Sequence, residues 1–310
     1  MHERILNDTP LRAGSASPRM ASALPSIIGH RGAKAVAPEN TLASIRAARA
    51  LGCTWVEVDV MLTKDLVPVI HHDNTLDRCT DGKGNLWDYN IDELERLDAG
   101  SHFASEYAGE RIPRLTALLQ CCRDLNLGLN LEVKHVTERS PDVPTASEQA
   151  MEETLAHVVC DTIETFGVRP SELVFSSFSR PAIAILRSRL PHFQCAFLVE
   201  KIPDDWFAFM TRHNCVSLNF GWNEEENTRE RIQECARNVL CYSYTVNDGA
   251  VAQQLLSWGV SGVFSDCPHL VEAALQAREL EERATLEQEP ALLLRSVSGS
   301  DLSLQAVGAA

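Results

Sequence analysis

Short apolar or β-branched runs alternate with longer segments of helical periodicity along most of this 310-residue chain. The runs are Ser26–Gly29, Trp55–Val60, Val67–Ile70, Gly128–Val133, Leu173–Ser176, Cys195–Val199, Val216–Leu218, Val239–Val246 and Gly262–Phe264. Apolar residues recur at helical spacing between most of them, in Thr41–Leu51, Thr116–Leu125, Met151–Phe166, Arg180–Leu190 and Ala250–Trp258. This alternation is typical of βα units on a parallel sheet. Eight or nine strands over roughly 250 residues favour an α/β fold of the (β/α)8 TIM barrel type over a doubly wound sheet.

Several parts of the chain depart from the alternation. Residues 74–113 are polar and contain Gly and Asp, which predicts a small insertion after the second strand region, and residues 136–147 predict a long loop after a strand. Residues 1–25 are rich in Ser, Pro, Ala and Arg and predict a flexible N-terminal arm, with Met1 and Met20 both open as the start of translation. Residues 284–310 predict a disordered tail, so that the barrel domain occupies residues 26–283.

The formal net charge is −15, and no basic stripe is present that could follow a nucleic-acid backbone. Such a charge repels anionic lipid surfaces, and no stretch reaches the roughly 20 apolar residues that span a bilayer. The N-terminal residues lack the apolar run of a signal peptide, and ten scattered cysteines without a CxxC pair are typical of buried thiols in a reducing compartment. We therefore expect a cytoplasmic protein without nucleic-acid partners or stable membrane association. The oligomeric state is left open.

The segment WVEVDV carries two carboxylates on one face of a predicted strand. Residues two apart in a strand share a face, so Glu57 and Asp59 point one way while the valines point the other. The segment LNLEVKHV repeats this arrangement with Glu132 and Lys134. Carboxylates that point into a barrel must be paired, protonated or bound to metal, and three oxygen ligands suit Mg²⁺ or Ca²⁺ better than zinc. The alternatives are a solvated face of an antiparallel sheet and, for Lys134, a salt bridge to Glu132.

Histidines stand at the ends of two predicted strands, His30 in SIIGHRGA and His72 in VPVIHHDN. Two imidazoles at one edge of a barrel can act as general base and general acid. Because His71 and His72 are adjacent, strand alternation sends only one of them inward, and the pattern alone does not say which.

Polar residues follow the first of these histidines. Arg31 offers a planar fork that suits a phosphate, and Gly32 lets the backbone bend closely around a ligand. The segment APENTLASIRAA predicts the start of a helix, with Asn40 or Thr41 as the N-cap. Glu39 in this segment either has a role in the site or favours the positive end of the helix dipole.

The segments HRGAKAVAPENT, VEVDVMLTKDLVPVIHHDNTLDRCTDGKG and NLEVK occur in this order and resemble the glycerophosphodiester phosphodiesterase family. The resemblance runs from about residue 27 to residue 268 and includes VFSSF, YTVND and WGVSGVFSDCP. In detail, the chain is similar to the short, cytoplasmic bacterial enzymes of this family. The resemblance implies a TIM barrel that hydrolyses glycerophosphodiesters, such as glycerophosphocholine and glycerophosphoethanolamine, to glycerol 3-phosphate and an alcohol.

The family pattern implies that Glu57, Asp59 and Glu132 hold one divalent cation, Mg²⁺ or Ca²⁺. It implies further that His30 and His72 are the acid–base pair, which favours His72 over its neighbour.

The same pattern implies that Arg31 and Lys134 bind the substrate phosphate and that Glu39 supports the HRG loop by hydrogen bonding. Two positions depart from it. Tyr244 stands before the TVN motif where many relatives have Trp, and His71 adds a second histidine beside the expected catalytic one.

Two other functions compete with hydrolysis. A lyase of the phospholipase D toxin type shares the paired histidines and carboxylates and forms a cyclic phosphate. A non-catalytic headgroup-binding barrel is expected to have lost a catalytic position, and none is lost here. The preferred headgroup alcohol, and the choice between Mg²⁺ and Ca²⁺, do not follow from the sequence.

Overall fold

The structure is a computed structural model that describes residues 24–135, 146–223, 225–278 and 280. Most of the predicted N-terminal arm, the predicted tail over 284–310, both candidate start residues and residues 136–145 of the loop predicted over 136–147 lie outside the described residues. Residues 146 and 147 are helical and not part of a loop. Leu24 falls within the predicted arm, yet it is buried, and its carbonyl oxygen accepts a hydrogen bond of 3.0 Å from the hydroxyl of Tyr242. The boundaries at residues 26 and 283 stay predictions.

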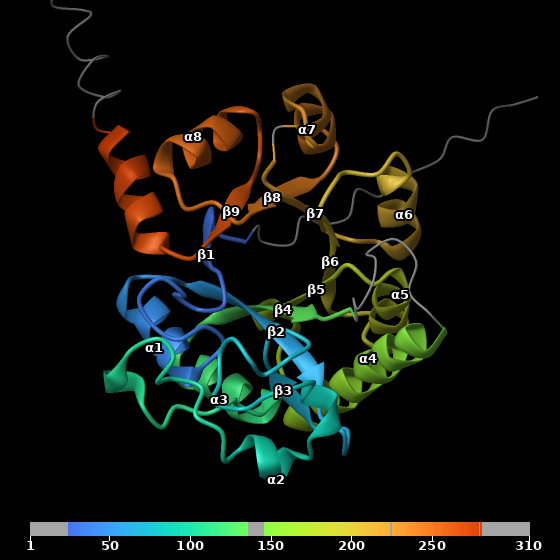
Figure 1. Ribbon diagram of the computed structural model, residues 1–310. Coiled ribbons are helices and arrows are strands. Elements are labelled where there is room, and N and C mark those ends of the chain that lie inside the picture. Colours follow the sequence, from blue (N-terminus) through green and yellow to red (C-terminus); the bar gives the residue numbers. More distant parts are fainter. Residues whose placement is uncertain (1–23, 136–145, 224, 279, 281–310) are drawn as a thin grey trace, which may run out of the picture.

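The strands of the described chain form a sheet of nine strands in the order β1-β9-β8-β7-β6-β5-β4-β2-β3, closed by a further pairing of β1 with β2 (Figure 1). All pairings are parallel except that of β3 with β2, so eight parallel strands close a barrel and β3 is a short antiparallel addition. The strands are β1 Ile27–Gly29, β2 Trp55–Leu62, β3 Pro68–Ile70, β4 Gly128–Val133, β5 Leu173–Ser177, β6 Gln194–Val199, β7 Ser217–Gly221, β8 Leu240–Tyr244 and β9 Gly262–Ser265. Each predicted run overlaps one of these strands, with ends that differ by up to three residues. The predicted (β/α)8 TIM barrel is confirmed.

Helices surround the barrel (Figure 1). They are α1 Leu42–Ala50, α2 Ile91–Leu94, α3 Leu115–Leu125, α4 Ala146–Phe166, α5 Arg180–Arg189, α6 Trp206–His213, α7 Arg229–Ala236 and α8 Gly249–Ser257, with a final helical segment over 268–278. Side-chain caps begin several of them: Thr41 accepts from the backbone of Ser44 at α1, and Asp248 accepts from two amides at α8. No helix within the described ranges is long and apolar enough to cross a membrane.

The barrel has two separate apolar regions because side chains alternate along each strand. Outward residues such as Val56, Val58 and Val60 pack with the helices in the main core. Inward residues including Ile28 and Phe264 form a smaller cluster inside the barrel, joined by Leu24. Glu57 and Asp59 therefore point inward, above that interior cluster, as the alternation predicts.

Residues 71–114 connect β3 to α3 and contain α2 and two short 3-10 helices, Leu86–Asp88 and Ser105–Tyr107. This segment has its own apolar cluster, which also takes in side chains from β2 and β3. Its members are Met61, Val69, Leu76, Leu86, Ile91, Leu94, Ala99 and Ile112. The cluster anchors the segment to the side of the barrel formed by β2 and β3, where it carries His71 and His72 to the barrel mouth.

Candidate active site

Three carboxylates meet at the C-terminal end of the barrel. β2 and β4 are parallel neighbours in which Asp59 pairs with Glu132 and Glu57 pairs with Asn130. Ligand oxygens of Glu57, Asp59 and Glu132 all lie within 4.8 Å of one another, and all three residues are buried. The strand register therefore brings together the three acidic side chains that the sequence predicts as metal ligands.

The electrostatics of this cluster favour the neutral form of two of its carboxyl groups. Burial, together with the charges of Asp59 and Glu132, raises the pKa of Glu57 well above its usual value. Burial also raises the pKa of Glu132, against the charge of Lys134. Within the described residues, Glu57 Oε1 is buried and has no hydrogen-bond partner. An all-oxygen set with an unpaired buried oxygen suits a hard divalent cation.

Lys134 lies on the same side of β4 as Glu132. Its Nζ is 2.8 Å from Glu132 Oε1 and 3.3 Å from Asp59 Oδ1. Although burial opposes it, the charges of Lys134 and Arg31 hold the pKa of Asp59 below its usual range. The salt bridge to Glu132 considered from the sequence is thus formed, and it places an ammonium group directly beside the carboxylate cluster.

The HRG loop wraps over the end of β2. Arg31 and Gly32 both have positive φ, of 51° and 85°, and a Cβ at residue 32 would clash with Ser44. This turn lets the backbone amide of Arg31 donate a hydrogen bond of 3.0 Å to Glu57 Oε2. Behind the loop, Asn40 Nδ2 donates to Asp59 Oδ2 at 2.8 Å, so two of the three carboxylates are oriented by the segment that follows β1.

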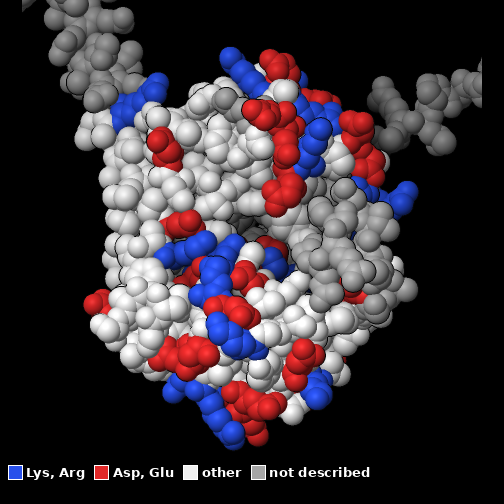
Figure 2. All heavy atoms as spheres, in the orientation of Figure 1, with Lys and Arg blue, Asp and Glu red and all other residues white. Residues whose placement is uncertain are grey.

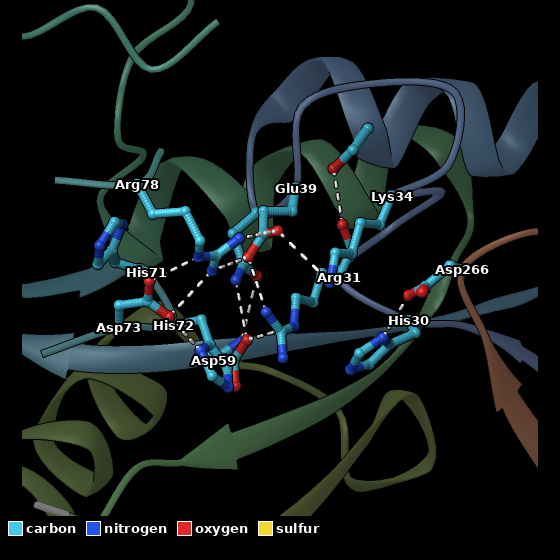
Figure 3. Close-up of polar contacts among 12 residues, drawn as sticks. His30, Arg31, Lys34, Glu39, Asp59, His71, His72, Asp73, Arg78 and Asp266 are labelled. Atoms are coloured by element: carbon cyan, nitrogen blue, oxygen red, sulfur yellow. Dashed lines mark hydrogen bonds and ion pairs between the residues drawn. The ribbon is translucent and has the colours of Figure 1, made fainter. Parts of the chain in front are cut away.

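Glu39 is the centre of a network of charges (Figure 3). It accepts from Arg31 at 2.7 Å and from both terminal nitrogens of Arg78 at 2.7 and 2.8 Å, and Lys34 Nζ is 3.6 Å away. Arg78 also donates to both oxygens of Asp73, at 2.7 and 2.9 Å. Although burial opposes it, the hydrogen bond from Arg78 and the charge of Arg31 hold the pKa of Glu39 well below its usual range. Glu39 thus links the HRG loop to the segment that follows β3.

His30 follows β1, the first strand of the barrel, and is held by Asp266, which follows the last strand, β9. Its Nδ1 lies 2.6 Å from Asp266 Oδ1 (Figure 3). Its Nε2 lies 3.9 Å from Glu57 Oε2. Asn247 fixes Asp266 in turn, because its side-chain amide donates to Asp266 Oδ2 at 3.0 Å and its Oδ1 accepts from the Asp266 backbone at 2.8 Å. Burial lowers the pKa of His30, and the hydrogen bond to Asp266 opposes this effect.

Of the two adjacent histidines after β3, His71 and His72, only one faces the carboxylates, as strand alternation requires. His71 is buried, and its Nε2 lies 3.0 Å from the carbonyl oxygen of Thr75. His72 is partly exposed, and its Nδ1 lies 2.6 Å from Asp73 Oδ1. Figure 3 shows His72 beside Asp59, whereas His71 points away from it. The imidazole that faces the carboxylates is therefore that of His72.

A small cavity of about 30 Å³ opens beneath these groups. It is lined by His30, Glu57, Asn130, Glu132, Ser176, Leu198, Tyr244 and Phe264. Figure 2 shows a hollow at the centre of this face, with acidic and basic side chains inside it and along its edge. All eight side chains predicted for the site lie around the mouth of the barrel.

The sequence profile of the glycerophosphoryl diester phosphodiesterase family matches residues 30–270. The chain belongs to this family.

A glycerophosphodiester phosphodiesterase from Caldanaerobacter subterraneus subsp. tengcongensis is 30% identical over 245 residues, which are 78% of this chain and 94% of that protein. One from Bacillus subtilis is 26% identical over 273 residues, 84% of this chain and 90% of that protein. Among solved structures, an Oleispira antarctica phosphodiesterase in complex with the product sn-glycerol-3-phosphate has 32% identity and a TM-score of 0.73, covering 82% of this chain and 97% of that one. The chain is therefore a phosphodiesterase that hydrolyses glycerophosphodiesters.

Several polar residues of this phosphodiesterase were not singled out from the sequence. Asp73, Arg78, Asn247 and Asp266 hold the two histidines and Glu39 in place. All four stand in segments that carry the family resemblance, so their motifs were visible although their contacts were not. The roles of the predicted site residues in binding and catalysis are taken up below as proposals.

Proposed function

We propose that this enzyme hydrolyses glycerophosphodiesters such as glycerophosphocholine and glycerophosphoethanolamine, with a divalent cation, to glycerol 3-phosphate and an alcohol, and that His30 and His72 perform the proton transfers. The observation that carries the proposal is the buried carboxylate triad, with an imidazole paired to an aspartate on either side of it. The product named for the Oleispira antarctica structure supports the choice of substrate.

Glu57, Asp59 and Glu132 would hold the cation, Mg²⁺ or Ca²⁺. Its chemistry there is to polarise a phosphate oxygen and to lower the pKa of the attacking hydroxyl group. Lys134 and Arg31 would bind the remaining phosphate oxygens, since both lie at the rim of the triad. Charge stabilisation of this kind is commonly the largest part of catalysis for anionic transition states.

The two histidines then transfer the protons. One accepts the proton of the nucleophile, a water or the 2-hydroxyl of the glycerol, as its oxygen bonds to phosphorus. Attack by water gives glycerol 3-phosphate directly, whereas attack by the 2-hydroxyl gives a cyclic phosphate that a water must then open. The other donates a proton to the alcohol oxygen as its bond to phosphorus breaks. Asp266 and Asp73 occupy Nδ1 of His30 and His72, which leaves Nε2 of each ring for these transfers.

Substitution of the histidines tests this assignment. We expect His30→Ala and His72→Ala each to lower kcat on glycerophosphocholine by about 10²–10⁴-fold, the usual contribution of general acid–base catalysis. His192→Ala, which removes an exposed histidine, is the control and should retain wild-type turnover. Full turnover by either of the first two variants would exclude that histidine from the reaction.

Chelation separates metal dependence from the roles of the histidines. Glycerol 3-phosphate release should stop in EDTA and return when Mg²⁺ or Ca²⁺ is added back. Phosphorus NMR of the products distinguishes hydrolysis, which gives the open phosphate monoester, from a lyase reaction, which gives a cyclic phosphate. A cyclic product that accumulates and persists would show that the lyase alternative is correct.

A further inference from the structure

A row of residues at the ends of three neighbouring strands lies across the barrel mouth from the HRG loop. Val199 pairs with Phe220 across β6 and β7, and Gly221 pairs with Tyr244 across β7 and β8. Glu200, which follows β6, therefore stands in line with Gly221 and Tyr244. A Cβ on residue 221 would lie only 2.7 Å from Glu200 Oε2. The glycine thus leaves room for the carboxylate of Glu200 and the ring of Tyr244 to meet.

The position of Glu200 is fixed by a buried amide. Asn227 is fully buried, and its Nδ2 donates to the carbonyl oxygens of Glu200 and Gly221 at 2.7 and 2.9 Å. Its Oδ1 accepts from the backbone of Ile202 at 2.9 Å. These three bonds tie the end of β6 to the end of β7, so Glu200 is held by the framework of the barrel rather than by a free loop.

Aromatic side chains stand beside this carboxylate. The rings of Phe178 and Tyr244 are 6.1 Å apart and nearly perpendicular, at 89°, and both residues are only partly buried. The hydroxyl of Tyr244 donates to Val199 O at 2.9 Å and is in contact with the carboxylate of Glu200. Tyr244 also lines the cavity that contains Glu57 and Glu132. The pair of rings and Glu200 are therefore continuous with the phosphate site.

Glu200 lacks a cationic partner in the part of the chain that the structure describes. No Lys, Arg or His there lies within ion-pair distance of it, whereas the carboxylates across the mouth pair with Arg31, Arg78 and Lys134. Partial burial raises the pKa of Glu200, and the nearby charge of Glu226 raises it further, while the contact with Tyr244 and the more distant charge of Lys134 oppose this rise.

We propose that Glu200, Phe178 and Tyr244 form a subsite for the leaving alcohol and that this subsite selects alcohols with a substituted ammonium group. A carboxylate beside perpendicular aromatic rings is the chemistry that recognises such cations. The inference rests on the proposed function. The glycerol and phosphate of the substrate carry no positive charge, so a cation can come only from the other alcohol. A zwitterionic diester then places its phosphate at the basic edge of the mouth and its ammonium at the acidic edge.

Comparison of two substrates tests the subsite. Glycerophosphocholine has a cationic leaving alcohol, and glycerophosphoglycerol has a neutral one, while the phosphate chemistry is the same. We expect the wild-type enzyme to prefer glycerophosphocholine. We expect Glu200→Gln to lower kcat/KM for glycerophosphocholine by about 10-fold, and to change kcat/KM for glycerophosphoglycerol by less than about 2-fold.

The neutral substrate also reports that the variant is folded. Glu230→Gln, which removes the same charge from the first turn of α7, is the matched control and should leave both values unchanged. An equal loss on both substrates, or no loss on either, contradicts a cation subsite at Glu200. So does a wild-type preference for glycerophosphoglycerol.

Direct binding separates this inference from the proposed function. Titration of the metal-loaded enzyme with tetramethylammonium, followed by calorimetry, should show binding that weakens in Glu200→Gln and in Phe178→Leu. If neither diester is hydrolysed by the wild-type enzyme, the proposed function is wrong, and this titration still tests the subsite. If tetramethylammonium binds equally to wild type and to both variants, the subsite is wrong even where hydrolysis is observed.

Discussion

At the scale of single residues, the two histidines of the site have the same hydrogen-bond arrangement. Each presents Nδ1 to an aspartate at 2.6 Å, His30 to Asp266 and His72 to Asp73. A carboxylate in this position fixes the ring orientation and keeps Nε2 available for proton transfer. The partners differ in origin, because Asp73 is the next residue in the chain whereas Asp266 is 236 residues away from His30.

We predict that Asp266→Asn impairs catalysis through His30 rather than through the fold. The carboxylate of Asp266 opposes the lowering of the His30 pKa by burial, so its removal lowers that pKa further. The limb of the pH profile of kcat/KM that reports His30 should therefore move to lower pH, whether the ring acts as base or as acid. We expect kcat to fall by about 10–100-fold, the range for residues that orient catalytic or metal-binding groups.

Steady-state kinetics between pH 5 and 9 on glycerophosphocholine measure both effects. Asp92→Asn, an exposed aspartate in the first turn of α2, makes the same chemical change outside the site and should leave the profile unchanged. A lower kcat with an unshifted profile would mean that Asp266 has a structural role only.

The sequence predicted the residues that strand alternation places and missed those that distant segments supply. Glu57, Asp59 and Glu132 follow from the period of two in β2 and β4, and their convergence depends only on those strands being neighbours. Arg78 and Asp266 contact Glu39 and His30 across 39 and 236 residues. No local pattern contains such contacts, because they depend on how the barrel closes.

At the scale of elements, the sequence predicted every strand but missed two of the helices. Buried strands are short apolar runs, and each was visible. α6 and α7 escaped prediction for different reasons. α6 has Trp206 and Phe209 in one continuous aromatic stretch without clear polar alternation, and α7 is strongly polar with only Ile232 and Cys235 buried. Both are short helices whose stability comes from packing on the barrel rather than from their own periodicity.

In the segment over 71–114, we expect a destabilising substitution to lower kcat without unfolding the barrel. It carries His72, Asp73 and Arg78, and its apolar cluster is distinct from the main core. Leu86 is fully buried in that cluster, so Leu86→Ala should cost about 2–5 kcal/mol locally. We expect the segment to loosen while the barrel remains closed, so kcat should fall well below the temperature of global unfolding.

Leu118→Ala provides the matched control. Leu118 is also fully buried, but it lies on α3 in the main core, so its loss should lower the global stability while leaving kcat near wild type at 25 °C. Turnover at that temperature and the melting curve from circular dichroism measure the two properties on both variants. If the two variants lose kcat equally, the segment and the barrel behave as one cooperative unit.

At the scale of the whole molecule, an enzyme with a net charge of −15 binds an anionic substrate through local positive charge. Arg31, Lys134 and Arg78 all lie at the mouth, yet each is already paired with a carboxylate. Uncompensated negative charge remains in the triad, where burial raises the pKa values of Glu57 and Glu132. A bound cation would neutralise this charge, so metal binding and the stability of the whole fold should be linked.

The sign of this linkage follows from Glu57. Its pKa in the folded protein lies above the ordinary value of 4.5, so its contribution to stability is fully present below that pH and is lost as pH rises through the folded pKa. A divalent cation replaces the missing proton, and the stabilisation that it gives should therefore grow from pH 5 to pH 8.

At 100 times its Kd the cation contributes about 2.7 kcal/mol, which raises Tm by about 5 °C. Thermal unfolding in EDTA and in excess Mg²⁺ or Ca²⁺ measures this difference. Glu57→Gln should remove most of the effect and should melt no lower than wild type in EDTA at pH 8, because a neutral amide replaces a buried carboxylate that has one oxygen without a partner. A Tm that does not respond to the cation at any pH would mean that the three carboxylates do not form a metal site.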